Sequence, residues 1–366
     1  MKLSVIILNY NVRYFLELCL KSVQSSIETL DAEIIVVDNS SSDDSCAMVK
    51  SLFPEVKLIK NKDNSGFSKG NNIGVDLAKG EYLCILNPDT VVAEDTFIKL
   101  LKFSNSKKNL GIVGCQLIDG KGNFLPESKR NVPTPKVSLK KMLGNAKGYY
   151  ANTLKAESVG EVDILVGAFM FMTKEVYQKV GGFDEDYFMY GEDIDLSYKV
   201  LKAGYTNYYF GETTIIHFKG ESTLRDANYA KRFYGAMQIF YKKHFKRNKL
   251  FNSLVWLGIK LAFILRTTQK LEPVKANQTY VFATKTDNKL IDKLEQPVSV
   301  LPQVLNEVPN QSMLVYDFNH LQIKSVIADM KEKSKQEHIV FRLLPKNSNF
   351  IIGSDSAINR GTIIHF

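Results

Sequence analysis

Residues 82–89 read Tyr-Leu-Cys-Ile-Leu-Asn-Pro-Asp, and this stretch decides the fold. The apolar run at 82–86 is short and continuous, which is typical of a parallel strand buried on both faces. Asn87 and Asp89 follow at the carboxyl end, where open α/β sheets bind their ligands. A carboxylate there suits a divalent cation, which in turn suits a diphosphate. An aspartate after a strand is also a common turn residue, so the metal interpretation depends on the rest of the chain.

Strand patterns alternate with helix patterns through the first part of the chain. Because this alternation is typical of βαβ units, it predicts an α/β fold with a mostly parallel sheet flanked by helices. Residues 120–160 are irregular, polar and rich in Pro, Lys and Asn, which favours a flap or an acceptor-side loop. The expected strands are 3–8, 33–37, 56–59, 82–86, 111–118 and 162–172, and the expected helices are 14–25, 45–53, 68–79, 174–180 and 193–203.

The composition and the residue patterns of the sequence predict a chain with three parts. The 366 residues, 45% hydrophobic and 24% charged, suffice for one large domain and a smaller one. Residues 1–225 hold the alternating pattern, 226–272 form a basic aromatic stretch, and 273–366 suggest a small α/β domain. That last part carries no strong motif, so the sequence assigns it no role.

The net charge of +9 is concentrated in one segment. Residues 225–270 hold eleven Lys or Arg and a single acid, a balance of +10, interleaved with aromatic residues such as Phe240 and Trp256. A basic, aromatic, helical stretch is typical of proteins that lie on an anionic membrane surface. Lys260 interrupts its most apolar part, 250–265, which favours lying on a membrane over crossing it. The alternatives are a basic helix packed on the domain by its aromatic face, and a nucleic-acid-binding segment that no other motif supports.

The cysteines and the N-terminus indicate the compartment. Cys19, Cys46, Cys84 and Cys115 are scattered and form no CxxC pair, so we expect buried, reduced thiols. The first strand begins at residue 3, which leaves no room for a signal peptide, and no apolar run reaches the roughly 18 residues of a membrane span. We therefore expect a cytoplasmic protein, peripheral on the inner face of the cell membrane.

Two polar turns follow early strands. Asp38 and Asn39 end the second strand, where a carboxylate can accept hydrogen bonds from a nucleobase or a ribose. Residues 64–72 form a Gly/Asn-rich turn running into a helix, which lets backbone N–H groups approach a ligand closely. Each turn also has an ordinary interpretation, as the start of a helix capped in the first case by Ser42 or Asp43.

Three more candidates lie far along the chain. Glu192 and Asp193 begin a helix, where acids commonly stabilise the helix dipole. The same dipole would keep Asp193 ionised and able to take a proton from a hydroxyl. His217 follows a strand-like run, and a lone histidine there is more often a packed residue than a ligand. It becomes a metal ligand only if the fold brings it to Asp89.

Taken in order, these segments resemble a family 2 glycosyltransferase of the GT-A fold. Residues 86–89 correspond to the family's metal-binding Asp-x-Asp motif, although Asn87 replaces its first aspartate and removes one negative charge. The resemblance covers roughly residues 1–225 and extends to bacterial rhamnosyltransferase-like enzymes that build surface polysaccharides. The matching motifs are 5–11, 36–40, 64–72, 86–89, 181–185, 190–196 and 216–217.

The resemblance implies an inverting transfer of a sugar from a UDP- or dTDP-sugar to a hydroxyl of a glycan or lipid-linked acceptor. It implies Mg²⁺ or Mn²⁺ held by Asp89 and His217. It further implies Asp193 as general base and Glu192 as the residue that binds the acceptor or orients Asp193. Expected partners are these substrates and the membrane surface, not a nucleic acid. The implied donor-binding residues are Asn9, Asp38, Asn39, Asn64, Gly66, Asn71 and Asn87.

Two other classes of protein fit the sequence less well. A sugar-1-phosphate nucleotidyltransferase would carry a Gly-rich, Arg-containing loop after the first strand, where residues 9–13 read Asn-Tyr-Asn-Val-Arg. A non-catalytic, membrane-associated protein with a decayed transferase domain would be expected to have lost one of the site residues. All of them are present: Asp38, Asp89, Glu192, Asp193 and His217.

Overall fold

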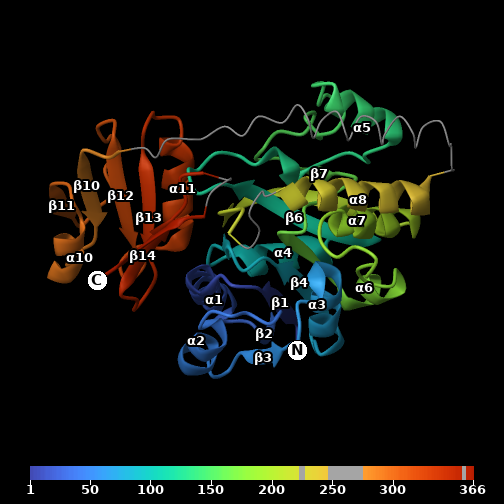
Figure 1. Ribbon diagram of the computed structural model, residues 1–366, viewed down its shortest axis with the longest axis horizontal. Helices are drawn as coiled ribbons and strands as arrows, with labels where there is room; N and C mark the ends of the chain where they lie inside the picture. The colour runs from blue at the N-terminus through green and yellow to red at the C-terminus, as the bar shows by residue number, and fades with distance from the viewer. Residues whose placement is uncertain (222–226, 246–274, 357–359) are drawn as a thin grey trace.

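The computed structural model describes residues 1–221, 227–245, 275–356 and 360–366. A nine-stranded sheet is built by the first part of the chain and a six-stranded sheet by the last part. The two sheets lie side by side, with α11 (Ile323–Lys333) of the second unit facing the first (Figure 1). The first sheet and its helices carry every residue that the sequence singled out for function.

The first sheet confirms the predicted α/β fold of GT-A type. Its order is β3-β2-β1-β4-β8-β6-β9-β5, with β7 paired to β9. β1 pairs in parallel with β2 and β4, whereas β8 runs antiparallel between β4 and β6. The strands are β1 (Leu3–Asn9), β2 (Ala32–Asp38), β3 (Lys57–Lys60), β4 (Tyr82–Leu86), β5 (Thr90–Val91), β6 (Leu110–Ile118), β7 (Val159–Glu161), β8 (Phe169–Thr173) and β9 (Thr206–His217).

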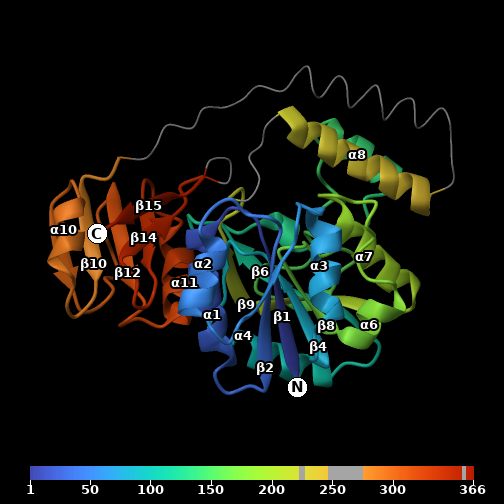
Figure 2. The ribbon, with the colours of Figure 1, turned by 60° about the horizontal axis from the view of Figure 1, so that its bottom comes forward.

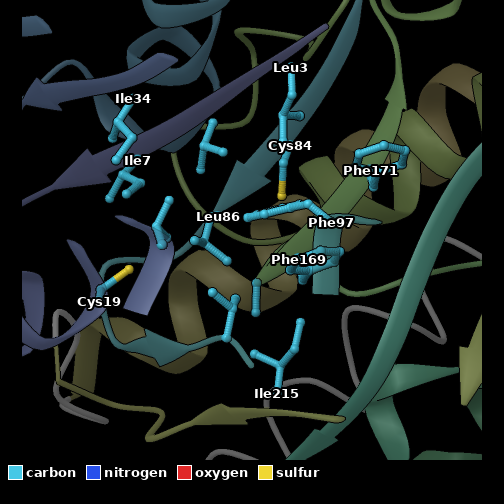
Figure 3. Close-up of a cluster of buried hydrophobic side chains, with 14 of the residues drawn as sticks. Leu3, Ile7, Cys19, Ile34, Cys84, Leu86, Phe97, Phe169, Phe171 and Ile215 are labelled. Carbon is cyan, nitrogen blue, oxygen red and sulfur yellow. The ribbon is translucent and has the colours of Figure 1, made fainter. Parts of the chain in front are cut away.

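Helices cover both faces of this sheet. Side chains alternate along β1, so Val5 and Ile7 pack toward α1, α2 and α4, while Ile6 packs toward α3, α6 and α7. The two groups of helices lie on opposite sides of the strands (Figure 2), and Figure 3 shows one of the two buried clusters. Because both faces are covered, a central strand such as β4 can be apolar throughout. The helices are α1 (Arg13–Ile27), α2 (Ser45–Leu52), α3 (Gly66–Asp76), α4 (Thr96–Asn105), α6 (Lys174–Lys179) and α7 (Glu192–Lys202).

The region from 120 to 173 differs from expectation in two ways. Only the end of the strand expected at 162–172 is a strand, β8, and the separate short strand β7 precedes it. Between the two, the backbone of Ile164 leaves the sheet to exchange two 2.9 Å hydrogen bonds with Arg130. The irregular segment contains a 3₁₀ turn (Pro126–Ser128) and a short helix, α5 (Pro135–Met142). Thr134 caps α5, and eight residues are too few to show a clear helical period in the sequence.

The second sheet has the order β11-β10-β12-β13-β14-β15. Its first four strands are parallel, and β14 and β15 add antiparallel pairs at one edge. The domain boundaries expected from the sequence stay a prediction. The elements are β10 (Gln278–Phe282), α10 (Asn288–Lys293), β11 (Val298–Leu301), β12 (Ser312–Asp317), α11, β13 (Val340–Leu344), β14 (Phe350–Gly353) and β15 (Thr362–His365).

One buried cluster joins the two units. Phe15 and Phe218 of the first unit belong to the same apolar cluster as Phe350 and Met330 of the second. Polar contacts reinforce it, because both carboxylate oxygens of Glu94 accept hydrogen bonds from the first backbone N–H groups of α11, at 2.6 and 3.0 Å. The second unit is therefore fixed to the first by a shared core and by a capped helix.

Helix α8 (Ala227–His244) is the described part of the basic aromatic segment. Phe240 and Tyr241 are buried, and both pack with Ile194 of α7. These two rings are therefore part of the core, as the packed-helix alternative predicts, and membrane contact by this segment stays a prediction. The remainder of the segment, 246–270, lies outside the described residues. Within the described part of the chain, no helix is both long enough and apolar enough to span a bilayer.

Replacing Glu94 with alanine tests how the units are joined. The first N–H groups of α11 lose their acceptors, so we expect the free energy of unfolding to fall by about 1–2 kcal/mol. Urea unfolding followed by circular dichroism measures the loss. Glu81→Ala is the control, because Glu81 forms only an exposed ion pair with Lys2 and such pairs contribute little. An equal loss in both variants would contradict the capping role.

Candidate functional site

A cavity of about 430 Å³ opens where several strands of the first sheet end. The turns after β1, β2 and β4, the end of β9, the start of α7 and the segment 127–150 all contribute to its wall. This is the crevice at the carboxyl ends of parallel strands where the fold is expected to bind ligands. The polar and aromatic side chains on the wall include Tyr10, Asn39, Asn64, Asn87, Asp89, Glu127, Arg130, Lys141, Tyr149, Glu192, Asp193 and His217.

Asp89 and His217 meet on this wall although 128 positions separate them in the sequence. The short strand β5 pairs antiparallel with β9 and sets Thr90 opposite His217. The imidazole Nε2 of His217 consequently lies 3.4 Å from Asp89 Oδ1 and 3.4 Å from Asn87 Nδ2. The sequence made His217 a candidate metal ligand only if the fold brought it to Asp89. The structure meets this condition.

The chemistry of these side chains fits a divalent cation. Asp89 Oδ1 is buried and has no hydrogen-bond partner among the residues that the structure describes, so its lone pairs are available to a cation. No group of three or more His, Cys, Asp or Glu that could hold a metal ion occurs in the described ranges of the chain. Two ligands suit a cation such as Mg²⁺, which proteins usually bind through one or two carboxylates together with substrate phosphates.

Glu192 and Asp193 begin α7 after Gly191, whose φ of 81° lets the chain turn into the helix. Asp193 is held by three donors: Arg130 Nη2 at 2.6 Å, Gly167 N at 3.1 Å and Ile194 N at 2.8 Å. Glu192 is different, because its Oε2 is buried and no hydrogen-bond partner for it occurs in the described part of the chain. Burial, with the neighbouring charge of Asp193, raises the pKa of Glu192 to about 8.

Arg130 is one of the site residues that sequence reasoning missed. It is 7% exposed, lines the cavity, and donates to both Asp193 Oδ2 and Leu165 O. Its partner Asp193 lies 63 positions away, and it sits in the irregular stretch that carries no periodic pattern. The one available signal is chemical: a buried carboxylate needs a cation, and the segment 128–156 is rich in them.

The turn after β2 forms a hydrogen-bonded network beside the cavity. Asn9 Nδ2 donates to Asp38 Oδ1 at 2.8 Å, and the backbone N of Ser41 donates to Asp38 Oδ2 at 3.0 Å. Asn9 and Asp38 are buried and are not among the residues on the cavity wall. They shape the turn that presents Asn39, whose Nδ2 donates to Asn64 Oδ1 at 3.2 Å, and both of these residues line the cavity.

Gly66 and Asn71 also lie off the cavity wall, and their expected role in donor binding stays a prediction. Gly66 has a φ of 82°, and a Cβ there would meet Phe188 O at 2.5 Å, so glycine permits a close backbone approach. Asn71 Nδ2 donates to Phe67 O within α3. The side chain turns back along its own helix because residues four apart share a face.

Comparisons with known proteins indicate the family to which this site belongs. The profile of the family described as Glycosyl transferase family 2 matches residues 4–181, and that of the N-terminal domain of galactosyltransferase matches residues 155–221. Residues 4–181 belong to glycosyltransferase family 2. The predicted membership and the predicted enzyme class, a glycosyltransferase with rhamnosyltransferase-like relatives, are confirmed.

Two relatives and one solved structure illustrate the similarity. The N-acetylglucosaminyl-diphospho-decaprenol L-rhamnosyltransferase of Mycobacterium tuberculosis is 26% identical over 241 residues, which is 61% of this chain and 78% of the relative. Rhamnosyltransferase WbbL of Escherichia coli is 30% identical over 162 residues, 42% of this chain and 61% of the relative. The mannosyltransferase PcManGT from Pyrobaculum calidifontis, solved with GDP-Man and Mn²⁺, is 18% identical with a TM-score of 0.48, covering 72% of this chain and 70% of its own.

Replacing Arg130 with methionine tests the ion pair inside the family 2 site. The change leaves the Asp193 carboxylate buried without its cation, so we expect the free energy of unfolding to fall by about 3–5 kcal/mol. Denaturant unfolding measures the loss, and Lys155→Met, at an exposed position, is the matched control. The double variant Arg130→Met/Asp193→Asn is expected to regain part of the stability, because neither partner is then left charged and unpaired. A single Arg130 variant as stable as the control would contradict the pairing.

Proposed function

We propose that this glycosyltransferase moves a sugar, with inversion, from a nucleotide-diphosphate donor to a hydroxyl of a lipid-linked glycan acceptor in the synthesis of a cell-surface polysaccharide. One observation carries the proposal. A single cavity has the Asp89–His217 pair and the Glu192–Asp193 pair on its wall. The first pair suits a diphosphate leaving group with its cation, and the second suits an attacking hydroxyl. Transfer needs both functions within reach of one reacting carbon.

On the donor side, Asp89 and His217 would hold Mg²⁺ or Mn²⁺, with Asn87 beside them. When bound, such a cation offsets the negative charge that develops on the leaving diphosphate. The unpartnered Oδ1 of Asp89 supports this assignment. Asn39 and Asn64 would contact the nucleotide, and Asn9 and Asp38 would fix the turn behind them. A UDP- or dTDP-sugar is the donor class that we propose.

On the acceptor side, the two carboxylates would take different roles because their surroundings differ. Asp193 is paired with Arg130, which orients its carboxylate, and a carboxylate can accept a proton from the attacking hydroxyl. Glu192 has a pKa of about 8, so it carries a proton at neutral pH and can donate a hydrogen bond to the acceptor. We therefore assign Asp193 as general base and Glu192 as an acceptor-binding donor.

The location that we propose is the inner face of the cell membrane. A lipid-linked acceptor lies in a bilayer, and the relative from Mycobacterium tuberculosis is named for transfer to a diphospho-decaprenol-linked sugar. The chain carries an excess of positive charge, +9 in total, which favours contact with anionic lipid.

The first test measures donor binding and hydrolysis across UDP-, dTDP- and GDP-sugars, with Mg²⁺, Mn²⁺ or EDTA. We expect metal-dependent selectivity for one nucleotide sugar. In the Asp89→Ala variant the metal-dependent part of the binding should be lost while metal-free nucleotide binding remains. Lys155→Met is the comparison, since Lys155 is exposed and lies off the cavity wall. Failure of the folded protein to bind any nucleotide sugar would contradict the proposal.

A second test separates the roles of the two carboxylates. Asp193→Asn should lower transfer by about 10²–10⁴-fold while sparing nucleotide binding, because the proton acceptor is lost. Glu192→Gln keeps a hydrogen-bond donor and should stay active. In the parent, kcat should fall as the pH rises through about 8, where Glu192 loses its proton, and this fall should be absent in Glu192→Gln. An inactive Glu192→Gln variant, with parental activity rising toward pH 8, would make Glu192 the base instead.

A further inference from the structure

The short helix α5 presents an apolar and basic face to solvent. Lys136, Leu139, Lys140 and Leu143 are all exposed, and Leu143 is 79% exposed at the end of the helix. Their spacing of i, i+3, i+4 and i+7 places them in one stripe along the helix. Two exposed leucines set between lysines are unusual on a surface that only meets water, since most exposed helix faces are polar.

The segment that contains α5 is strongly basic. Residues 128–156 hold seven Lys or Arg and neither Asp nor Glu. Lys129 and Arg130 point into the protein and are buried, whereas Lys136, Lys140, Lys147 and Lys155 are exposed. The outward charge is therefore positive throughout, with no acidic residue of the same segment to neutralise it.

The opposite side of this segment belongs to the catalytic cavity. Lys141 and Tyr149 lie on its wall, and Lys141 Nζ sits 3.2 Å from the centre of the Tyr149 ring. Helix α8 holds α5 from behind, because Tyr241 Oη contacts Ser138 Oγ and donates to Pro133 O at 3.1 Å. Figure 1 shows α5 beside α8, at the end of the molecule away from the second sheet. A partner that binds the outer face of α5 would therefore lie next to the opening of the cavity.

We propose that the face formed by Lys136, Leu139, Lys140 and Leu143, here named the α5 face, docks on the surface of an anionic lipid bilayer. Lysines gather at anionic headgroups, and leucines insert at the boundary between headgroups and acyl chains. An acidic protein or a nucleic acid would satisfy the lysines but would leave the leucines exposed. The use of the docking rests on the proposed function, because it brings the cavity to a lipid-linked acceptor.

The test is flotation of the full-length protein with phosphatidylcholine vesicles that contain or lack phosphatidylglycerol. We expect binding only to the anionic vesicles, and weaker binding at high salt. Leu139→Asn/Leu143→Asn and Lys136→Gln/Lys140→Gln should each weaken it about tenfold or more. Leu52→Asn/Leu77→Asn and Lys102→Gln/Lys108→Gln are the matched controls, because these residues are exposed elsewhere and should change nothing.

Several outcomes would overturn the proposal. These are no vesicle binding by the parent, equal binding by parent and α5 variants, or equal loss in α5 and control variants. A short RNA duplex is tested as a competitor of the vesicles for the parent protein. If the duplex competes and also binds the leucine variant but not the lysine variant, the α5 face is a polyanion site and not a membrane site. All α5 variants should keep the parental rate of donor hydrolysis without vesicles. Loss of donor turnover in the parent, with vesicle binding intact, would refute the proposed function and leave the docking standing.

Discussion

Burial of β4 on both faces is the constraint on which the rest of the site depends. Leu83 and Ile85 pack on one side of the sheet, and Cys84 and Leu86 pack on the other. A strand fixed in this way also fixes the position at which Asn87 begins the next turn, and Asn87 N donates a 3.0 Å hydrogen bond to Ala168 O, just before β8. The turn then enters β5, whose pairing with β9 carries His217 to Asp89. Hydrophobic burial in the middle of the sheet thereby positions a polar pair at its edge.

The acidic pair is positioned by a different interaction, the buried ion pair between Arg130 and Asp193. A buried carboxylate costs free energy unless a cation and hydrogen bonds compensate it. Arg130 supplies the cation, and the departure of Ile164 from the sheet, which divides β7 from β8, gives Arg130 its place. Glu192 has no ion-pair partner of this kind among the described residues, and burial together with the charge of Asp193 raises its pKa to about 8. Two adjacent carboxylates in one helical turn thus have different surroundings.

The same segment, 120–160, connects the site with the surface. Its Arg130 and Lys141 face the cavity, and α5 faces solvent. Helix α8 buries Phe240 and Tyr241 against α7, and His244 Nε2 of α8 lies 2.6 Å from Asp195 Oδ1. These two aromatic residues, from the segment that suggested membrane contact, are therefore part of the core, whereas exposed leucines lie on α5, where the sequence shows no periodic pattern. Burial, rather than composition, decides which apolar residues remain available to a partner.

The sequence by itself determined the α/β fold, the family and the polar residues at the strand ends, because strand and helix periods, turn residues and motif order are local properties of the chain. It could also place Asp89 and Glu192–Asp193 at element boundaries, for the same reason. Only the tertiary structure decided that His217 meets Asp89, that Arg130 pairs with Asp193, and that Asn71 turns back into α3. Each of these depends on a contact between side chain and partner that sequence spacing does not encode. The chain fixes which groups are available, and packing fixes which of them meet.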